Sequence, residues 1–195
     1  MKNIFKLFLV GLVIAGTSSS CSDSELPIDE LYDGVDLTGA FCRTLESPLQ
    51  LVNVSDPEKN FIAATIEVQE GQGTVSTFTE VRVYVSTFND QNQLEPTLDT
   101  NGNPLGETLL STLPASDFEL SEQNRLPSNA FSIPTQQVLD LNPTAVFSLP
   151  TFIFVRLELE LADGRIFTNT NVGPSVQAGN YFVAPMAYNI IFLNN

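Results

Sequence analysis

Apolar and polar residues alternate along most of the chain after residue 37. The clearest case is residues 152–161, where every second residue from 153 to 161 is isoleucine, valine or leucine. The intervening positions include Arg156, Glu158 and Glu160. Because successive side chains of a β-strand point to opposite faces, this spacing predicts a strand with one buried face and one polar face.

Residues 78–88 repeat the pattern, with three valines on one face and Glu80, Arg82 and Tyr84 on the other. We expect the aliphatic rows of the two strands to lie next to each other within one sheet or to face each other across two sheets. The predicted core comprises Val81, Val83, Val85, Ile153, Val155, Leu157, Leu159 and Leu161.

A β-hairpin is predicted where residues 152–161 are followed by Asp163-Gly164 and a second apolar run at 166–168. Asp-Gly between two alternating runs favours a two-residue type I′ turn, in which both turn residues have positive φ.

Turn-forming residues separate the remaining apolar runs and define their bounds. Further strands are predicted at residues 39–45, 48–54, 61–69, 106–111, 116–120, 129–133 and 181–193. One short helix is predicted at 134–141, because proline suits the first turn of a helix. This succession predicts an all-β fold, an immunoglobulin-like antiparallel β-sandwich with one short helix, as a single domain over residues 38–195. A small antiparallel β-barrel is the alternative, since periodicity does not distinguish the two.

The first 20 residues have the pattern of a secretory signal peptide. Lys2 and Lys6 precede ten apolar residues at 7–16, a run that is shorter than the roughly 20 residues needed to span a bilayer. Small residues then lead to Cys21, without the Ala-x-Ala pattern of an ordinary cleavage site. Residues 21–37 are rich in acids and contain no base, which predicts an acidic flexible tether.

The sequence around Cys21 resembles the lipobox of bacterial lipoproteins, although serines occupy positions 18 and 20, where other residues are usual. The serines and the acidic stretch at 22–25 are similar to those of Bacteroidota surface lipoproteins. The resemblance implies lipid modification of Cys21, cleavage before it, and attachment to the outer membrane with the chain facing the cell exterior. An ordinary cleaved signal peptide is the alternative.

A second resemblance is carried by residues 131–134, 152–171 and 181–188. These segments look like those of uncharacterised Bacteroidota surface lipoproteins, which resemble the immunoglobulin-like accessory lipoproteins of starch-utilisation-type uptake systems. The resemblance implies a binding or accessory module for an outer-membrane protein partner or a glycan, and assigns no functional residue.

Charge and composition exclude several classes of function. The chain has a formal net charge of −15 and contains no histidine. So acidic a surface repels phosphate backbones and predicts no nucleic-acid partner. The missing histidine excludes Ser-His-Asp and Cys-His catalysis. We expect no cofactor.

Two patterns resemble chemical sites. Asp99, Asn101 and Asn103 match the start of a calcium-binding loop, but Pro104 replaces its required glycine and Leu110 its final glutamate. A hairpin tip without metal is therefore predicted.

Carboxylate pairs are the second pattern. Glu158 and Glu160 lie on one strand face about 7 Å apart, and we expect them to be solvated. A carboxylate-based hydrolase acting on a surface polysaccharide is the alternative function, since such chemistry requires only two suitably placed carboxylates.

Cys42 is the other cysteine of the chain and lies in an apolar, strand-like run. A buried and inert thiol is predicted, with a disulfide to Cys21 as the competing assignment.

Exposed aromatic side chains are the candidates for ligand binding, because their ring faces offer apolar contact area. Phe152, Phe154 and Tyr84 lie on the polar faces of the two best-defined strands, and Tyr181 and Tyr188 are further candidates. The sequence thus predicts a non-catalytic outer-membrane surface lipoprotein that acts by binding.

Overall fold

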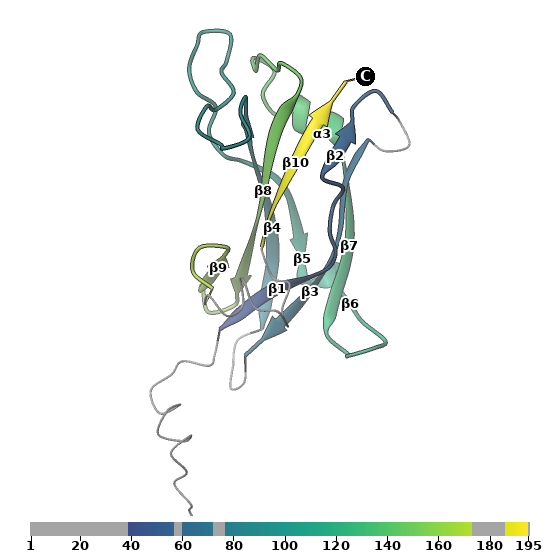
Figure 1. Cartoon of the computed structure of the whole chain (residues 1–195). Coiled ribbons are helices and arrows are strands. Elements are labelled where there is room, and N and C mark those ends of the chain that lie inside the picture. Colours follow the sequence, from purple (N-terminus) through teal and green to yellow (C-terminus); the bar gives the residue numbers. More distant parts are fainter. Residues whose placement is uncertain (1–38, 57–59, 72–76, 173–185, 195) are drawn as a thin grey trace, which may run out of the picture. The chain divides into compact units, whose positions relative to one another are not determined.

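The computed structural model describes residues 39–56, 60–71, 77–172 and 186–194, which form two β-sheets (Figure 1). The predicted signal peptide, Cys21 and the acidic tether lie outside the described residues.

The smaller sheet contains four antiparallel strands in the order β1-β3-β7-β6. Their bounds are Ala40–Glu46 for β1, Phe61–Glu70 for β3, Pro127–Pro134 for β7 and Glu119–Leu120 for β6.

The larger sheet follows the order β2-β10-β8-β4-β5, with β9 paired to β8. Strands β2 and β10 are parallel, and the other pairs are antiparallel. The strands are β2 (Leu51–Asn53), β10 (Ala187–Leu193), β8 (Thr151–Leu161), β4 (Phe78–Phe88), β5 (Thr108–Pro114) and β9 (Ile166–Thr168).

The strand order identifies the fold class. In immunoglobulin domains, strands A, B, E and D form one sheet, and G, F and C form the other, which C′ can extend. Here β1, β3, β7 and β6 occupy the positions of A, B, E and D, while β10, β8, β4 and β5 occupy those of G, F, C and C′. The predicted immunoglobulin-like sandwich is therefore confirmed. The barrel alternative is wrong, because no strand pairing within the described residues joins the two sheets.

The predicted short helix is confirmed as α3, Thr135–Asp140, which directly follows Pro134. A single 3₁₀ turn, η1 (Ala115–Asp117), occupies the start of the strand predicted at 116–120 and leaves only β6 of it. In the described part of the chain, no helix is both long enough and apolar enough to cross a membrane.

The core lies between the sheets and follows the predicted alternation. Along β8, buried and partly exposed side chains alternate at all 11 positions. The two aliphatic rows are adjacent within the larger sheet, where Val83 pairs with Leu157 and Val85 with Val155. All eight predicted core residues are buried.

The β8–β9 hairpin is confirmed, but its predicted turn type is wrong. Gly164 has a φ of +86°, whereas Asp163 is not among the residues with positive φ. The amide of Gly164 donates to the Leu161 carbonyl, and the amide of Leu161 donates to the carbonyl of Arg165. The connection is therefore longer than two residues, and a single left-handed glycine closes it.

The burial of Leu157 generates a stability prediction. Leu157→Ala removes a fully buried side chain, and we expect it to lower the free energy of unfolding by about 2–5 kcal/mol through lost burial and a residual cavity. The matched control is Leu109→Ala on β5 of the same sheet, where the leucine is 44% exposed and the expected loss is about 1 kcal/mol or less. Urea melts of the two variants measure both values. Equal losses would contradict the assignment of Leu157 to the core.

Candidate functional site

An apolar row crosses the outer face of the larger sheet near one end of the strands. Phe88 on β4 pairs with Phe152 on β8, Phe152 pairs with Ile191 on β10, and Ile191 pairs with Leu51 on β2. In each of these strands, the neighbouring residues of the same strand are buried. The side chains of the apolar row therefore lie on the opposite face of the sheet. Four strands thus place apolar side chains side by side on a face turned away from the core.

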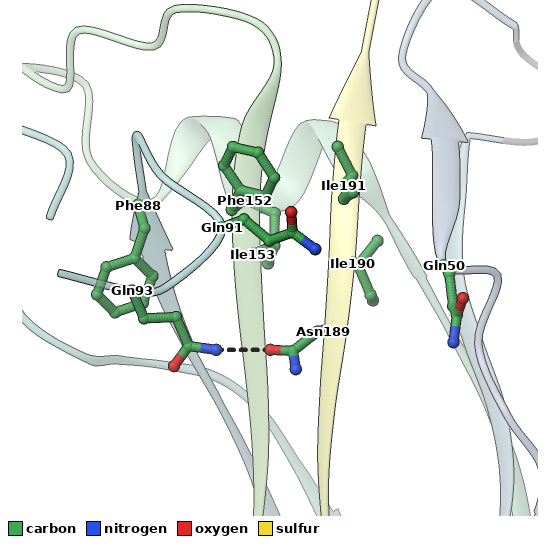
Figure 2. A pocket seen from close by; sticks show the side chains of 9 residues that line it. All are labelled: Gln50, Phe88, Gln91, Gln93, Phe152, Ile153, Asn189, Ile190 and Ile191. Carbon is green, nitrogen blue, oxygen red and sulfur yellow. Dashed lines mark hydrogen bonds between the residues drawn. The ribbon is translucent and has the colours of Figure 1, made fainter. Parts of the chain in front are cut away.

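A pocket of about 250 Å³ lies over this row (Figure 2). Phe88, Phe152 and Ile191 provide apolar walls, and Ile153 and Ile190 contribute beneath them. Its polar lining consists entirely of side-chain amides, from Gln50, Gln91, Gln93 and Asn189. Among the described residues that line the pocket, none carries a charged side chain.

The loop after β4 holds two of the four amides in place. The Asp90 carboxylate accepts hydrogen bonds from the backbone amides of Asn92, Leu94 and Glu95, at 2.7–2.9 Å. Asp favours such turns because its short side chain reaches nearby backbone amides. Gln93 has a φ of +61° within the turn. The carboxylate therefore fixes the backbone that carries Gln91 and Gln93.

A side-chain hydrogen bond joins this loop to β10. Gln93 Nε2 donates to Asn189 Oδ1 at 2.6 Å, across a separation of 96 residues. Figure 2 shows this bond between the Gln93 and Asn189 side chains. The pocket is consequently closed on one side by a contact that links two distant segments.

The second half of the loop between β4 and β5 forms the hairpin tip predicted around Asp99. Asp99 Oδ1 accepts hydrogen bonds from the backbone amides of Asn101 and Asn103, and Oδ2 accepts one from Asn103 Nδ2. These bonds, above all those from Asn103, hold the pKa of Asp99 below its ordinary value of 3.8. The carboxylate thus organises its own turn. In the part of the chain that the structure describes, no three acidic or cysteine side chains converge as metal ligands.

Of the aromatic candidates, Phe152 lines the pocket, whereas Phe154 and Tyr84 do not. Tyr84 instead lies beneath a guanidinium group, with Arg156 Cζ 4.6 Å from its ring centroid. Tyr188 is buried, and its hydroxyl and that of Thr44 share a hydrogen bond of 2.8 Å, so its candidacy as an exposed platform is wrong. Burial raises the pKa of Tyr188 to about 12. Tyr181 lies outside the described residues.

The prediction that Glu158 and Glu160 form a freely solvated face is wrong. Glu158 Oε1 lies 3.1 Å from Arg82 Nε, and Oε2 lies 3.0 Å from a terminal nitrogen of Arg156. Glu160 also pairs with Arg82. Arg82 is the register partner of Glu158 on the neighbouring strand, so the sheet itself brings the opposite charges together. The side chain of Glu158 is only 14% exposed.

Arg156 extends this group of ion pairs to Glu107, the residue that precedes β5. Its Nε and one terminal nitrogen donate to the two carboxylate oxygens of Glu107, at 2.8 and 2.6 Å. These bonds outweigh desolvation and raise the pKa of Arg156 above its ordinary value. The guanidinium is therefore already satisfied by carboxylates and does not serve the pocket.

A buried carboxylate on the smaller sheet was missed by sequence reasoning. The side chain of Glu67 on β3 is 1% exposed and pairs with Arg43 on β1 at 2.7 Å. Asn124, in the turn between β6 and β7, donates from Nδ2 to both oxygens of Glu67. Glu67 therefore anchors that turn over the sheet. In the sequence, Glu67 falls on the polar face of its strand, so the alternation did not predict that its side chain is buried.

Cys42 matches its prediction as a buried thiol, with no exposed surface. Burial raises the pKa of its thiol to about 12, which keeps it protonated and unreactive at neutral pH. A disulfide to Cys21 would require access to a sulfur that the core encloses.

No protein-family model matches the chain, and no curated protein matches it. Among solved structures, the chain is similar to the structure of murine CRIg, with 10% sequence identity and a TM-score of 0.32. The match covers 80% of this chain and 98% of that chain. The immunoglobulin-like class rests on the strand order described above.

The position of Glu158 between two guanidinium groups predicts a measurable role in stability. Exposed ion pairs contribute about 0.2–1 kcal/mol, and breaking a buried pair costs about 3–5 kcal/mol. For the partly buried Glu158 we expect Glu158→Gln to lower the free energy of unfolding by about 1–2 kcal/mol, and by less in high salt. Urea melts at low and high salt measure this loss.

The matched control is Glu119→Gln, an exposed glutamate on β6, for which we expect a change within about 0.5 kcal/mol. Equal and salt-independent effects of the two substitutions would contradict the structural role of the ion pairs.

Proposed function

We propose that the chain is a non-catalytic lipoprotein of the outer-membrane surface, anchored through Cys21, that binds an uncharged ligand in the pocket on the larger sheet. The ligand is a glycan or a segment of a protein partner. One observation carries the proposal: on a chain with a net charge of −15, all the described residues that line the pocket have amide or apolar side chains.

The chemistry of the lining favours binding over catalysis. Amide side chains donate and accept hydrogen bonds but do not exchange protons near neutral pH. A glycoside hydrolase requires two carboxyl groups that flank the bond to be cleaved. Glu158 and Glu160, the pair considered for that role, contact Arg82 and do not line the pocket. The hydrolase alternative therefore has no support from the geometry of this site.

The fixed conformation of the loop also supports a binding role. Asp90 fixes the turn that carries Gln91 and Gln93, and the bond from Gln93 to Asn189 joins this turn to β10. Ordering a side chain on binding costs about 0.5–1.5 kcal/mol, and groups already held in place avoid part of that cost. The pocket is thus ordered before a ligand arrives.

The position of the pocket suits a protein that is anchored at its N-terminus. Gly39, where the described chain begins, lies beside Phe167 on β9, and Phe167 pairs with Leu159 on β8. Phe152, in the pocket, is seven residues earlier on β8, which corresponds to about 23 Å along the strand. The described chain therefore begins near the end of β8 that lies opposite the pocket.

The anchoring part of the proposal predicts the behaviour of Cys21→Ala. Without the thiol there is no acceptor for the lipid, so we expect the variant to be released from the membrane fraction or to remain unprocessed with its leader. Mass spectrometry of the N-terminus and membrane fractionation measure the two outcomes. Cys42→Ala is the control, and we expect it to stay lipid-modified and membrane-bound. A native N-terminus at any residue other than a modified Cys21 would contradict lipid anchoring.

The binding part predicts where a ligand contacts the chain. A photo-reactive amino acid is introduced at Gln91, on the pocket wall, in cells that carry the full-length protein. We expect illumination to produce a covalent adduct from this position. The same amino acid at Thr112, an exposed position on β5 away from the pocket, should give none. Digestion of the adduct with proteases and with glycosidases then distinguishes a protein ligand from a glycan. No adduct at position 91, or equal adducts at both positions, would overturn the assignment of the pocket.

A further inference from the structure

The polar atoms of the pocket fit neighbouring hydroxyl groups. In their mutual hydrogen bond, Gln93 uses one donor and Asn189 uses its oxygen. The Gln93 oxygen and the Asn189 nitrogen take no part in that bond. A hydroxyl group can donate to the first of these atoms or accept from the second, so the pair can bind hydroxyls of both roles.

The apolar walls fit the C–H face of a sugar ring. Phe88 and Phe152 are register partners on adjacent strands, so their side chains stand next to each other. Aromatic rings offer broad, rigid apolar area at a low cost in conformational entropy. A pyranose combines such an apolar face with hydroxyls around its rim, and the pocket combines the complementary groups.

The charges around the pocket disfavour ionised ligands of either sign. Among the described lining residues there is no cationic side chain to bind an anion, and Arg156, two residues beyond Phe154 on β8, forms ion pairs with Glu107 and Glu158. The net charge of −15 adds long-range repulsion. A cationic ligand finds no carboxylate in the lining, so its desolvation would not be repaid.

The backbone beneath the pocket favours a saccharide over a peptide. Extended peptides commonly bind by adding a strand to an open sheet edge, where backbone groups supply the affinity. Here the floor is formed by β8 and β10, whose backbones pair with each other from Ala187 opposite Arg156 to Phe192 opposite Thr151. A peptide over this floor would gain no ladder of backbone hydrogen bonds from β8 and β10 between these residues, whereas a saccharide needs none.

The size of the pocket limits how much of a saccharide enters it. Pockets that enclose a drug-sized ligand measure about 300–1,000 Å³, and this pocket is smaller, at about 250 Å³. Leu94 and Leu51, the chain neighbours of Gln93 and Gln50, are 78% and 59% exposed. The site therefore accommodates one sugar ring, with exposed apolar side chains beside it for the rings that follow.

We infer that this pocket binds one ring of an uncharged hexose saccharide and discriminates against acidic saccharides, an inference that rests on the proposed binding function. Phe152 supplies the stacking face, Asn189 supplies a hydrogen-bond donor and Gln93 supplies an acceptor. Asp90 is a positioning residue, since it acts through the turn that carries Gln93.

The test titrates the full-length lipoprotein, in a detergent without a sugar headgroup, with two sets of oligosaccharides by calorimetry. One set contains neutral gluco-, manno- and galacto-configured oligomers, and the other contains oligomers of hexuronic acids. We expect binding to at least one neutral oligomer and weaker or no binding to the acidic set. Phe152→Leu keeps the apolar volume but removes the ring, and should weaken binding on the order of 10-fold. Asn189→Asp removes the donor and adds a charge, and should weaken it at least as much.

Phe154→Leu is the matched control, because Phe154 lies on the same face of the same strand as Phe152 but does not line the pocket. We expect this variant to bind the oligosaccharide with the affinity of the native chain. Thermal melts of each variant verify folding. Tighter binding of the acidic set, or neutral binding that neither pocket variant weakens, would overturn the inference. No binding across both sets, together with a protein adduct at position 91, would overturn the saccharide and leave the binding function standing. No binding to either set and no adduct at position 91 would contradict both the saccharide inference and the proposed binding function.

Discussion

Strands β4 and β8 pair antiparallel along nearly their whole length, from Phe78 opposite Leu161 to Phe88 opposite Phe152. This register sets the two faces of the larger sheet. On the inner face it aligns the valines of β4 with the aliphatic residues of β8, and on the outer face it aligns the polar and aromatic residues. A slip of one residue would exchange the faces and expose the core. The fold, the ion pairs and the pocket therefore all depend on this one pairing.

The outer face changes character along the strands. Phe88 and Phe152 lie at the pocket end, Tyr84 and Arg156 meet further along, and Arg82 with Glu158 follows. The chain has a large excess of acids, and four of its five arginines are held in place by carboxylates: Arg43, Arg82, Arg156 and Arg165 form ion pairs. These four guanidinium groups thus act within the scaffold, and the described residues that line the pocket are uncharged.

Two aspartates give the long loop after β4 its shape. Asp90 and Asp99 each accept several hydrogen bonds from nearby backbone amides. The backbone of the second turn also bonds to the chain near residue 145, through Thr100 to Thr144 and Val146 to Leu98. A loop of this length would ordinarily lose much conformational entropy on binding. These contacts fix it as part of the folded domain and link the folding of the domain to the formation of the site.

The sequence by itself determined the period-two strands, the core of β4 and β8, the short helix, the burial of Cys42 and the immunoglobulin-like class. These features depend on local spacing, which an isolated strand already carries. It also placed Phe152 among five aromatic candidates but did not separate it from Phe154. Only the tertiary structure decided that Gln50, Gln91, Gln93 and Asn189 meet beside Phe152. Strand pairing and the Gln93–Asn189 hydrogen bond bring together segments that are far apart in the sequence. The burial of Glu67 and the pairing of Glu158 with Arg82 were likewise decided by neighbouring strands and turns. The alternation within one strand predicts which face a side chain lies on, but it does not predict which other residues cover that face.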